Sequence, residues 1–296
     1  MLPLIVLSFI FKSLLTLSLA TKPISDICFP TDFDPARSCI LCDLDGTLLS
    51  GHHGVSSDNL AAIKESIAEG FHFIPATGRT RVSMRNAVGQ DFVNQLFGGL
   101  HKTPGIYQQG LMVFGLDGEL IYERSLPSDV ITVVSQYCRE RGLSVVAYSA
   151  DQIFCEQRTE LTDLVTAYKD PLPTEFPAGL DRLQDSGVTV HKLIILSTPD
   201  GIPAIRAGVE PMLEGLASVT QAVPEMLEVL PLGGCKGDGV RRFLEHIGVK
   251  PADAIAFGGT TTLLFRFFEL MMYFRWGERY RGTSLHLFAS GNSHSL

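Results

Sequence analysis

The chain has 296 residues, which allows one or two domains, and 45% of them are hydrophobic, enough for a sizeable core. Its net charge of −8 argues against a nucleic-acid-binding surface, because domains that bind nucleic acid are usually basic. Six cysteines are too sparse in a chain of this length to form a disulfide scaffold.

Residues 1–11 are almost wholly apolar, apolar residues resume over residues 13–20, and the first acidic residue is Asp26. The sequence Ser18-Leu19-Ala20 has the small residues of a signal-peptide cleavage site. We therefore interpret residues 1–35 as a targeting-like segment for the secretory pathway or an organelle, and a plastid is as compatible as secretion. The alternative is a cytoplasmic protein whose N-terminus packs on the domain. Lys12 interrupts the apolar run, so membrane association is expected only if an uncut segment acts as a tether.

Residues 38–50 carry the most informative local pattern. Cys39 to Cys42 form an apolar run that predicts a buried strand, and Asp43 and Asp45 follow it directly. Residues two apart in a strand share a face, and two adjacent carboxylates need a cation or a shared proton. A solvated turn is the alternative. Cys39 and Cys42 face opposite ways on a strand, so they are interpreted as buried hydrophobic residues and not as a zinc or redox pair.

A strand–helix–strand unit follows. A helix is expected to begin at Ser57, which would cap it, and to end at Gly70, before a strand over residues 71–76. This spacing predicts a parallel sheet, with Thr77 and Gly78 at the carboxyl end of the second strand, where ligands bind. A hydroxyl and a backbone N–H are groups that suit a phosphate oxygen.

Further along, residues 81–96 predict one helix, and residues 105–114 and 120–124 predict two strands around the turn Asp117-Gly118. Roughly 100 residues of α/β pattern come next, which is too long for a loop and predicts a second domain. His191 lies in a predicted strand there. We interpret it as a strand histidine with a hydrogen-bond partner, and a substrate contact is the alternative.

Lys236 precedes a predicted helix, in the sequence Lys236-Gly237-Asp238-Gly239. A cation at this place would stabilise the negative charge of a phosphoryl group during its transfer. The alternative is a glycine-rich turn with a solvated lysine.

Three motifs in order resemble those of the haloacid dehalogenase-like hydrolases: Asp43-Leu44-Asp45-Gly46-Thr47, Thr77-Gly78-Arg79 and Lys236-Gly237-Asp238-Gly239. Residues 104–126 resemble the Cof-type subfamily. The resemblance implies an α/β fold, with a Rossmann-like parallel-sheet core domain and an inserted α/β cap domain. We expect the core domain at residues 36–126 and 229–258 and the cap domain at residues 127–228.

The resemblance also implies a magnesium-dependent phosphatase that hydrolyses small phosphate monoesters, such as sugar phosphates, nucleotides, or flavin or pyridoxal phosphates. Asp43 would be the nucleophile and Asp45 the general acid and base. Thr77, Gly78 and Lys236 would bind the phosphoryl group, and Asp43 and Asp45 would hold Mg²⁺. The expected partner is a small phosphorylated metabolite.

The family pattern stops at Gly258. The family continues with Gly-Asp-x-x-x-Asp, whose acids complete the magnesium site, whereas here no Asp follows Asp253. Residues 259–296 are therefore expected to be a divergent tail. One hypothesis is that the coding sequence leaves its ancestral frame or exon near Gly259. Loss of these acids should weaken metal binding, so the alternative function is a catalytically impaired protein that binds a phosphorylated ligand.

Overall fold

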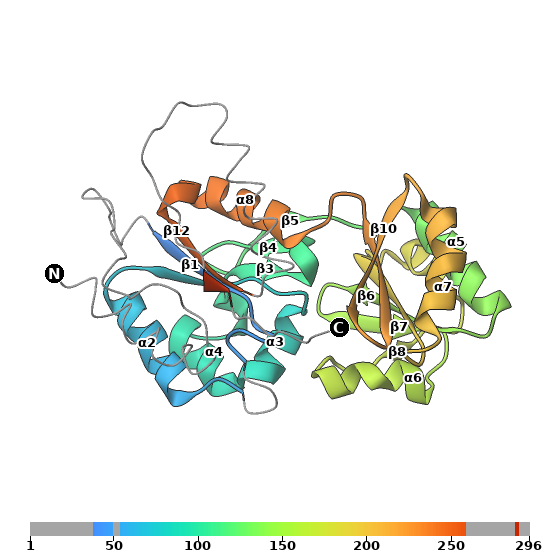
Figure 1. The fold of residues 1–296 in the computed structure, drawn as a ribbon, viewed down its shortest axis with the longest axis horizontal. Coiled ribbons are helices and arrows are strands. Elements are labelled where there is room, and N and C mark those ends of the chain that lie inside the picture. Colours follow the sequence, from blue (N-terminus) through green and yellow to red (C-terminus); the bar gives the residue numbers. More distant parts are fainter. Residues whose placement is uncertain (1–37, 50–53, 259–287, 290–296) are drawn as a thin grey trace. The chain divides into compact units, whose positions relative to one another are not determined.

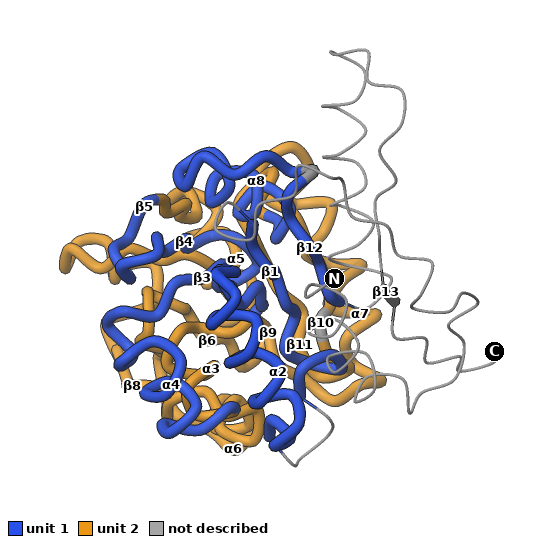
Figure 2. Tube along the Cα trace, turned by 90° about the vertical axis from the view of Figure 1, so that its left-hand side faces the viewer, with its two compact units in different colours: residues 1–78, 88–121, 235–296 blue, residues 79–87, 122–234 orange. Residues whose placement is uncertain are grey.

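The computed structural model describes residues 38–49, 54–258 and 288–289. The targeting-like segment 1–35 and nearly all of the expected tail 259–296 lie outside the described residues. The chain divides into two compact units (Figure 2). Unit 1 comprises residues 1–78, 88–121 and 235–296, and unit 2 comprises residues 79–87 and 122–234.

Unit 1 is built on a four-stranded parallel sheet with the order β13-β12-β1-β2. Ile40 of β1 pairs with Ile255 of β12 on one side and with Phe73 of β2 on the other. A strand between two parallel neighbours is buried on both faces, which explains the unbroken apolar run of β1. The bounds are β1 Cys39–Cys42, β2 His72–Pro75, β12 Ala254–Gly258 and β13 Phe288–Ala289.

Two helices cover this sheet from opposite faces, α2 (Ser57–Ala68) and α8 (Lys236–Ile247) (Figure 1). The N-cap of α2 is Ser56 and not Ser57, because the Ser56 hydroxyl accepts a 3.1 Å hydrogen bond from the Asn59 N–H. Both serines fit the capping preference, so the sequence alone could not decide between them.

Two predicted elements are each divided in the structure. The single helix expected over residues 81–96 is two helices, α3 (Arg81–Val88) and α4 (Gln90–Phe97), because Gly89 between them has a φ of 93°. The single strand expected over residues 105–114 is a hairpin of β3 (Gly105–Tyr107) and β4 (Met112–Phe114). The short helical turn η4 (Gln108–Gly110) joins these strands, and β5 (Leu120–Glu123) completes their small sheet.

Unit 2 contains a six-stranded mixed sheet with the order β10-β11-β9-β6-β7-β8. Its strands are β6 Ser144–Ser149, β7 Gln152–Cys155, β8 Thr174–Glu175, β9 Lys192–Leu196, β10 Ala217–Val223 and β11 Met226–Pro231. Its helices, besides most of α3, are α5 Ser128–Glu140, α6 Glu160–Asp163 and α7 Ile202–Val209.

Alternate residues of the unit 2 strands enter two apolar clusters. Leu193 and Ile195 of β9 pack in a cluster with residues of α5 and α7, whereas Ile194 and Leu196 pack in a second cluster with Val165. This alternation is the period of two that a sheet requires. The sheet is therefore covered on both faces.

The predicted fold class is confirmed: a parallel-sheet α/β domain is interrupted by a second α/β unit. Within the described residues, no helix combines the length and the apolar character needed to cross a lipid bilayer.

Candidate active site

Asp43 and Asp45 differ in their surroundings. Asp43 directly follows β1, and its N–H donates a 2.9 Å hydrogen bond to the carbonyl of Phe257. The residue is only 8% exposed, whereas Asp45 is exposed. Both acids follow the strand, as expected, but they do not share the same surroundings, because the chain turns immediately after Cys42, with Gly46 at a φ of 71°.

Lys236 is the first residue of α8, and its side chain contacts Asp43 although the two residues are far apart in the sequence. Its Nζ lies 2.8 Å from Oδ1 of Asp43, and both side chains are largely buried, with exposures of 7% and 12%. The Leu44 N–H donates to the same oxygen at 2.8 Å. A cation and a backbone donor thus contact the same oxygen of this carboxylate. The alternative interpretation of Lys236 as a solvated turn residue is wrong.

Thr77 lies at the carboxyl end of β2, beside the end of β1. The Ala76 N–H donates to the Cys42 carbonyl at 2.9 Å, so the residues after both strands leave the sheet at neighbouring positions. Thr77 is fully buried, and its N–H donates to the carbonyl of Ile106 at 2.8 Å. Gly78 follows as a partly exposed residue. The sheet therefore places Thr77 and Gly78 next to the strand end that carries Asp43.

Sequence reasoning missed a contact between Gln109 and this strand end. The Gln109 N–H donates to the Thr77 carbonyl at 3.2 Å. A Cβ atom built on Gly78 would lie 2.7 Å from Nε2 of Gln109, so the amide covers Gly78 closely. The signal available in the sequence was Gly110, since a glycine after two polar residues is typical of a turn inside an otherwise apolar run.

The two cysteines of β1 are buried, as expected for core residues. Burial raises the pKa of the Cys39 thiol to about 12, with the Asp253 carboxylate adding to the shift. Burial and the Asp43 carboxylate raise the pKa of the Cys42 thiol even further. Both thiols stay protonated at neutral pH, which makes them poor nucleophiles and poor metal ligands.

His191 lies in unit 2, one residue before β9, and it is 2% exposed. Its Nδ1 accepts a 3.1 Å hydrogen bond from the Ala150 N–H, and its Nε2 lies 3.3 Å from a carboxylate oxygen of Glu123. Both ring nitrogens have partners, so the expectation of a hydrogen-bonded histidine is confirmed.

Unit 2 also contains a buried charged group that the sequence did not reveal. Lys192 and Glu228, each 3% exposed, form an ion pair at 2.7 Å, and the lysine Nζ lies 4.6 Å from the Tyr148 ring centre. The Tyr148 hydroxyl donates to Asp170 at 2.7 Å. Burial raises the pKa of Asp170 above its ordinary value, although the hydrogen bond from Tyr148 opposes this shift.

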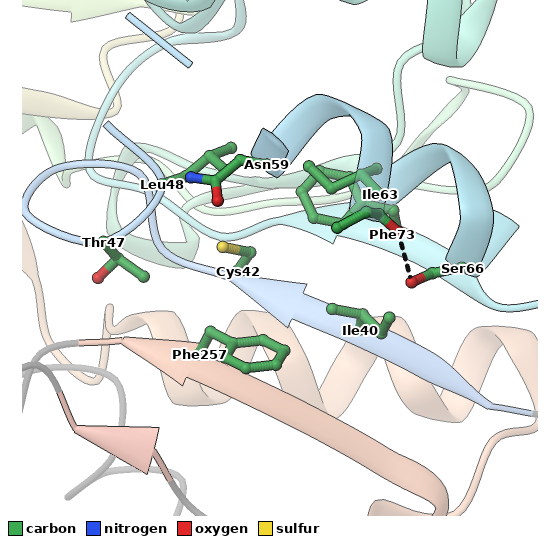
Figure 3. Close-up of a pocket in the computed structure, with 10 residues that line it drawn as sticks. Ile40, Cys42, Thr47, Leu48, Asn59, Ile63, Ser66, Phe73 and Phe257 are labelled. Carbon is green, nitrogen blue, oxygen red and sulfur yellow. Dashed lines mark hydrogen bonds between the residues drawn. The ribbon is translucent and has the colours of Figure 1, made fainter. Parts of the chain in front are cut away.

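An apolar pocket lies between α2 and the sheet of unit 1 (Figure 3). Ile63 and Ser66 of α2, Ile40 of β1 and Phe257 of β12 contribute to its wall. Its lining includes neither Thr77 nor Lys236, and it offers no cation for an anionic ligand. Asp43 itself is not part of the lining either.

The described residues contain no group of three or more His, Cys, Asp or Glu side chains that could hold a metal ion. The oxygen atoms of Asp43 and Asp45 are nevertheless of the type that Mg²⁺ prefers. This ion is usually bound through one or two carboxylates, with water and substrate phosphate completing its octahedral shell. The residues present therefore fit Mg²⁺ better than they fit a metal that requires histidine or thiolate ligands.

Comparison with known proteins supports the resemblance seen in the motifs. The family described as haloacid dehalogenase-like hydrolase matches residues 40–261. A chloroplastic endoribonuclease YBEY of Arabidopsis thaliana is 32% identical over 234 residues, 76% of this chain and 39% of that protein. The chain thus spans well under half the length of this relative.

Two further comparisons cover most of both chains. An HMP-PP phosphatase of Yersinia pseudotuberculosis is 25% identical over 217 residues, 73% of this chain and 75% of that protein. A crystal structure from Thermotoga maritima superposes with a TM-score of 0.68 at 22% identity, over 78% of this chain and 83% of that chain. This structural likeness bears on the fold alone.

Proposed function

Because the chain belongs to the haloacid dehalogenase-like hydrolase family, we propose that it is a magnesium-dependent phosphatase that hydrolyses small phosphate monoesters through an aspartyl-phosphate intermediate. The observation that carries the proposal is the contact of the Lys236 Nζ with the Asp43 carboxylate at 2.8 Å. A phosphate monoester is an anion, and a carboxylate attacks it only where positive charge offsets their repulsion.

In the first step, an oxygen of Asp43 attacks the phosphorus atom and the bond from phosphorus to the leaving oxygen breaks. Both hydrogen bonds described above end on Oδ1, so we assign the attack to Oδ2. Asp45 donates a proton to the leaving oxygen. Its exposed position would allow the product alcohol to depart and water to enter.

In the second step, Asp45 accepts a proton from water, the water oxygen attacks phosphorus, and the bond to Asp43 breaks. Inorganic phosphate is released and both carboxylates return to their starting states. Thr77, Gly78 and Lys236 hold the phosphoryl oxygens during both steps, through a hydroxyl, a backbone N–H and an ammonium group.

Asp43, through its carboxylate, and Asp45, through its backbone carbonyl, would hold Mg²⁺. When bound, this ion supplies positive charge that offsets the repulsion between the nucleophile and the phosphate. The expected third acidic ligand of the family has no counterpart in the sequence that follows Gly258, so we expect weak metal binding.

We further propose that unit 2 is the cap, which selects the substrate, and that the substrate is a small phosphorylated metabolite. The name of the Yersinia relative supports a small phosphorylated compound. We do not extend the ribonuclease activity of the Arabidopsis relative to this chain, because the chain spans only 39% of that protein.

For localisation, we propose that residues 1–35 direct the chain to a plastid. The chloroplastic relative favours this destination over secretion. A fluorescent protein fused after residue 35 should enter plastids in plant cells, whereas diffuse cytoplasmic fluorescence would contradict the proposal.

The function is tested by phosphate release from 4-nitrophenyl phosphate, with MgCl₂ and then with excess EDTA. We expect release that EDTA suppresses and that Asp43→Asn lowers by about 10³-fold or more, as for other enzymes that lose a nucleophile. Asp91→Asn, at an exposed position of α4, is the matched control and should retain activity.

A second outcome would identify the alternative function. If inorganic phosphate binds but no substrate is hydrolysed, the chain is a binder of phosphorylated ligands and not an enzyme. Equal turnover by the wild type and Asp43→Asn would contradict the assignment of Asp43 as the nucleophile.

A further inference from the structure

Three consecutive residues between β3 and β4 have left-handed backbone conformations. Their φ angles are 50° for Gln108, 61° for Gln109 and 87° for Gly110. Glycine adopts such angles freely, but for the two glutamines they carry a steric cost. Conformations of this kind persist where the surrounding structure enforces them, and they concentrate at functional sites.

On one side, this turn is fixed to Thr77 and Gly78. The Gln109 N–H donates to the Thr77 carbonyl at 3.2 Å. The side chain of Gln109 folds over the next residue, because a Cβ atom on Gly78 would lie 2.7 Å from its Nε2 and 3.1 Å from its Cδ. The main chain and the side chain of Gln109 therefore both meet the strand end that carries Thr77.

On the other side, the turn is packed against the start of α8. A Cβ atom on Gly110 would lie 2.8 Å from the carbonyl carbon of Cys235 and 3.2 Å from Cα of Lys236. Only a glycine fits in this space. The turn thus lies between Thr77–Gly78 and the residue whose ammonium group contacts Asp43.

We propose that the side-chain amide of Gln109 is a further phosphate-binding group, which donates an N–H from Nε2 to an oxygen of the phosphoryl group at Thr77, Gly78 and Lys236. This inference rests on the proposed function. An amide donor strengthens binding of a charged oxygen without placing a second cation beside Asp43. The strained turn holds that donor in position before the ligand arrives.

The test compares binding of inorganic phosphate by titration calorimetry, in MgCl₂, for the wild type and Gln109 variants. Gln109→Met keeps the length of the side chain and its packing on Gly78 but removes the donor. We expect about tenfold weaker binding or more for this variant. Gln109→Glu keeps the shape and adds a negative charge, so it should bind more weakly still. Gln90→Met, at the exposed start of α4, is the control and should bind like the wild type.

Thermal unfolding separates binding from packing, since Gln109→Met should unfold near the wild-type temperature. If Gln109→Met does not fold, phosphate binding is measured in Gln109→Glu instead. Wild-type affinity for phosphate in whichever of these variants folds overturns the inference. Lys236→Met distinguishes failure of the role of Gln109 from failure of the proposed phosphate site as a whole. Loss of phosphate binding in Lys236→Met with unchanged binding in Gln109→Met overturns only the role of Gln109. Absence of phosphate binding by the wild type overturns that role and the proposed phosphate site together.

Discussion

Lys236 and Asp43 are 193 residues apart in the sequence, yet the Nζ of one lies 2.8 Å from Oδ1 of the other. The contact joins the first strand of unit 1 to the helix that follows the whole of unit 2. The two charges are largely buried, so each depends on the other for compensation.

Lys236→Met should therefore lower both stability and turnover. We expect a loss of about 3–5 kcal/mol in the free energy of unfolding, because Asp43 would keep a buried charge without its partner. Turnover should fall by about 10²–10³-fold, as when a donor to developing negative charge is removed. Urea unfolding by circular dichroism and phosphate release measure the two effects.

A double-mutant cycle measures the interaction energy between the Asp43 and Lys236 side chains separately from the other effects of each substitution. Asp43→Asn combined with Lys236→Met should be more stable than the sum of the single changes predicts. Strictly additive losses would show that the two charges do not depend on each other. Lys250→Met, at an exposed position of the same unit, is the control and should leave stability unchanged.

Gly110→Ala should damage the junction between the turn and α8. A Cβ atom there would overlap the Cys235 carbonyl, and the φ of 87° adds a steric cost, so we expect a loss of about 3 kcal/mol or more. Gly248→Ala has a similar φ of 69° with no atom within 4 Å of the new Cβ, and should cost about 1 kcal/mol. Equal losses in the two variants, measured by urea unfolding, would mean that the close approach at Gly110 is unimportant.

In unit 2, Lys192→Met should destabilise the protein by about 3–5 kcal/mol, because it removes one partner of a buried ion pair with the Glu228 carboxylate. Combining it with Glu228→Leu should recover most of this loss, since an apolar pair of similar volume needs no compensation. The exposed pair of Arg182 and Asp185 is the control, and Arg182→Ala should cost less than about 1 kcal/mol. Equal urea midpoints for Lys192→Met and Arg182→Ala would contradict this prediction.

Asp170 should make stability depend on pH in a direction opposite to that of a typical paired carboxylate. Burial raises its folded-state pKa above the ordinary value of 3.8, so the folded protein binds this proton more tightly than the unfolded chain does. Protonated Asp170 makes its full contribution to the free energy of unfolding when the pH is below its pKa in the unfolded chain. This contribution is lost as the pH rises through its pKa in the folded protein.

The comparison of wild type with Asp170→Asn isolates this effect. Asparagine can still accept the hydrogen bond of the Tyr148 hydroxyl but does not titrate. Relative to the variant, the wild type should lose stability as the pH is raised from 4 to 8 in urea unfolding experiments. A relative gain with rising pH would mean that the folded-state pKa of Asp170 is lowered instead.

Much of the local structure could be predicted from the sequence, because its signals lie within a few residues. The apolar run from Cys39 to Cys42 indicated β1, and the glycine at position 70 indicated the end of α2. The order of three short motifs predicted the family, and the matched region over residues 40–261 agrees with it. The hairpin within residues 105–114 was missed, since glutamine rarely adopts the left-handed angles seen at Gln108 and Gln109.

The sequence by itself determined which residues follow the strands, and so which side chains gather at the carboxyl edge of a parallel sheet. Only the tertiary structure decided which of them are buried and what they contact. Asp43 is buried while Asp45, two residues later, is exposed, because the chain turns immediately after β1. The contacts of Lys236 with Asp43 and of Gln109 with Gly78 depend on packing between segments that are distant in the sequence. Local sequence patterns do not determine how such segments pack.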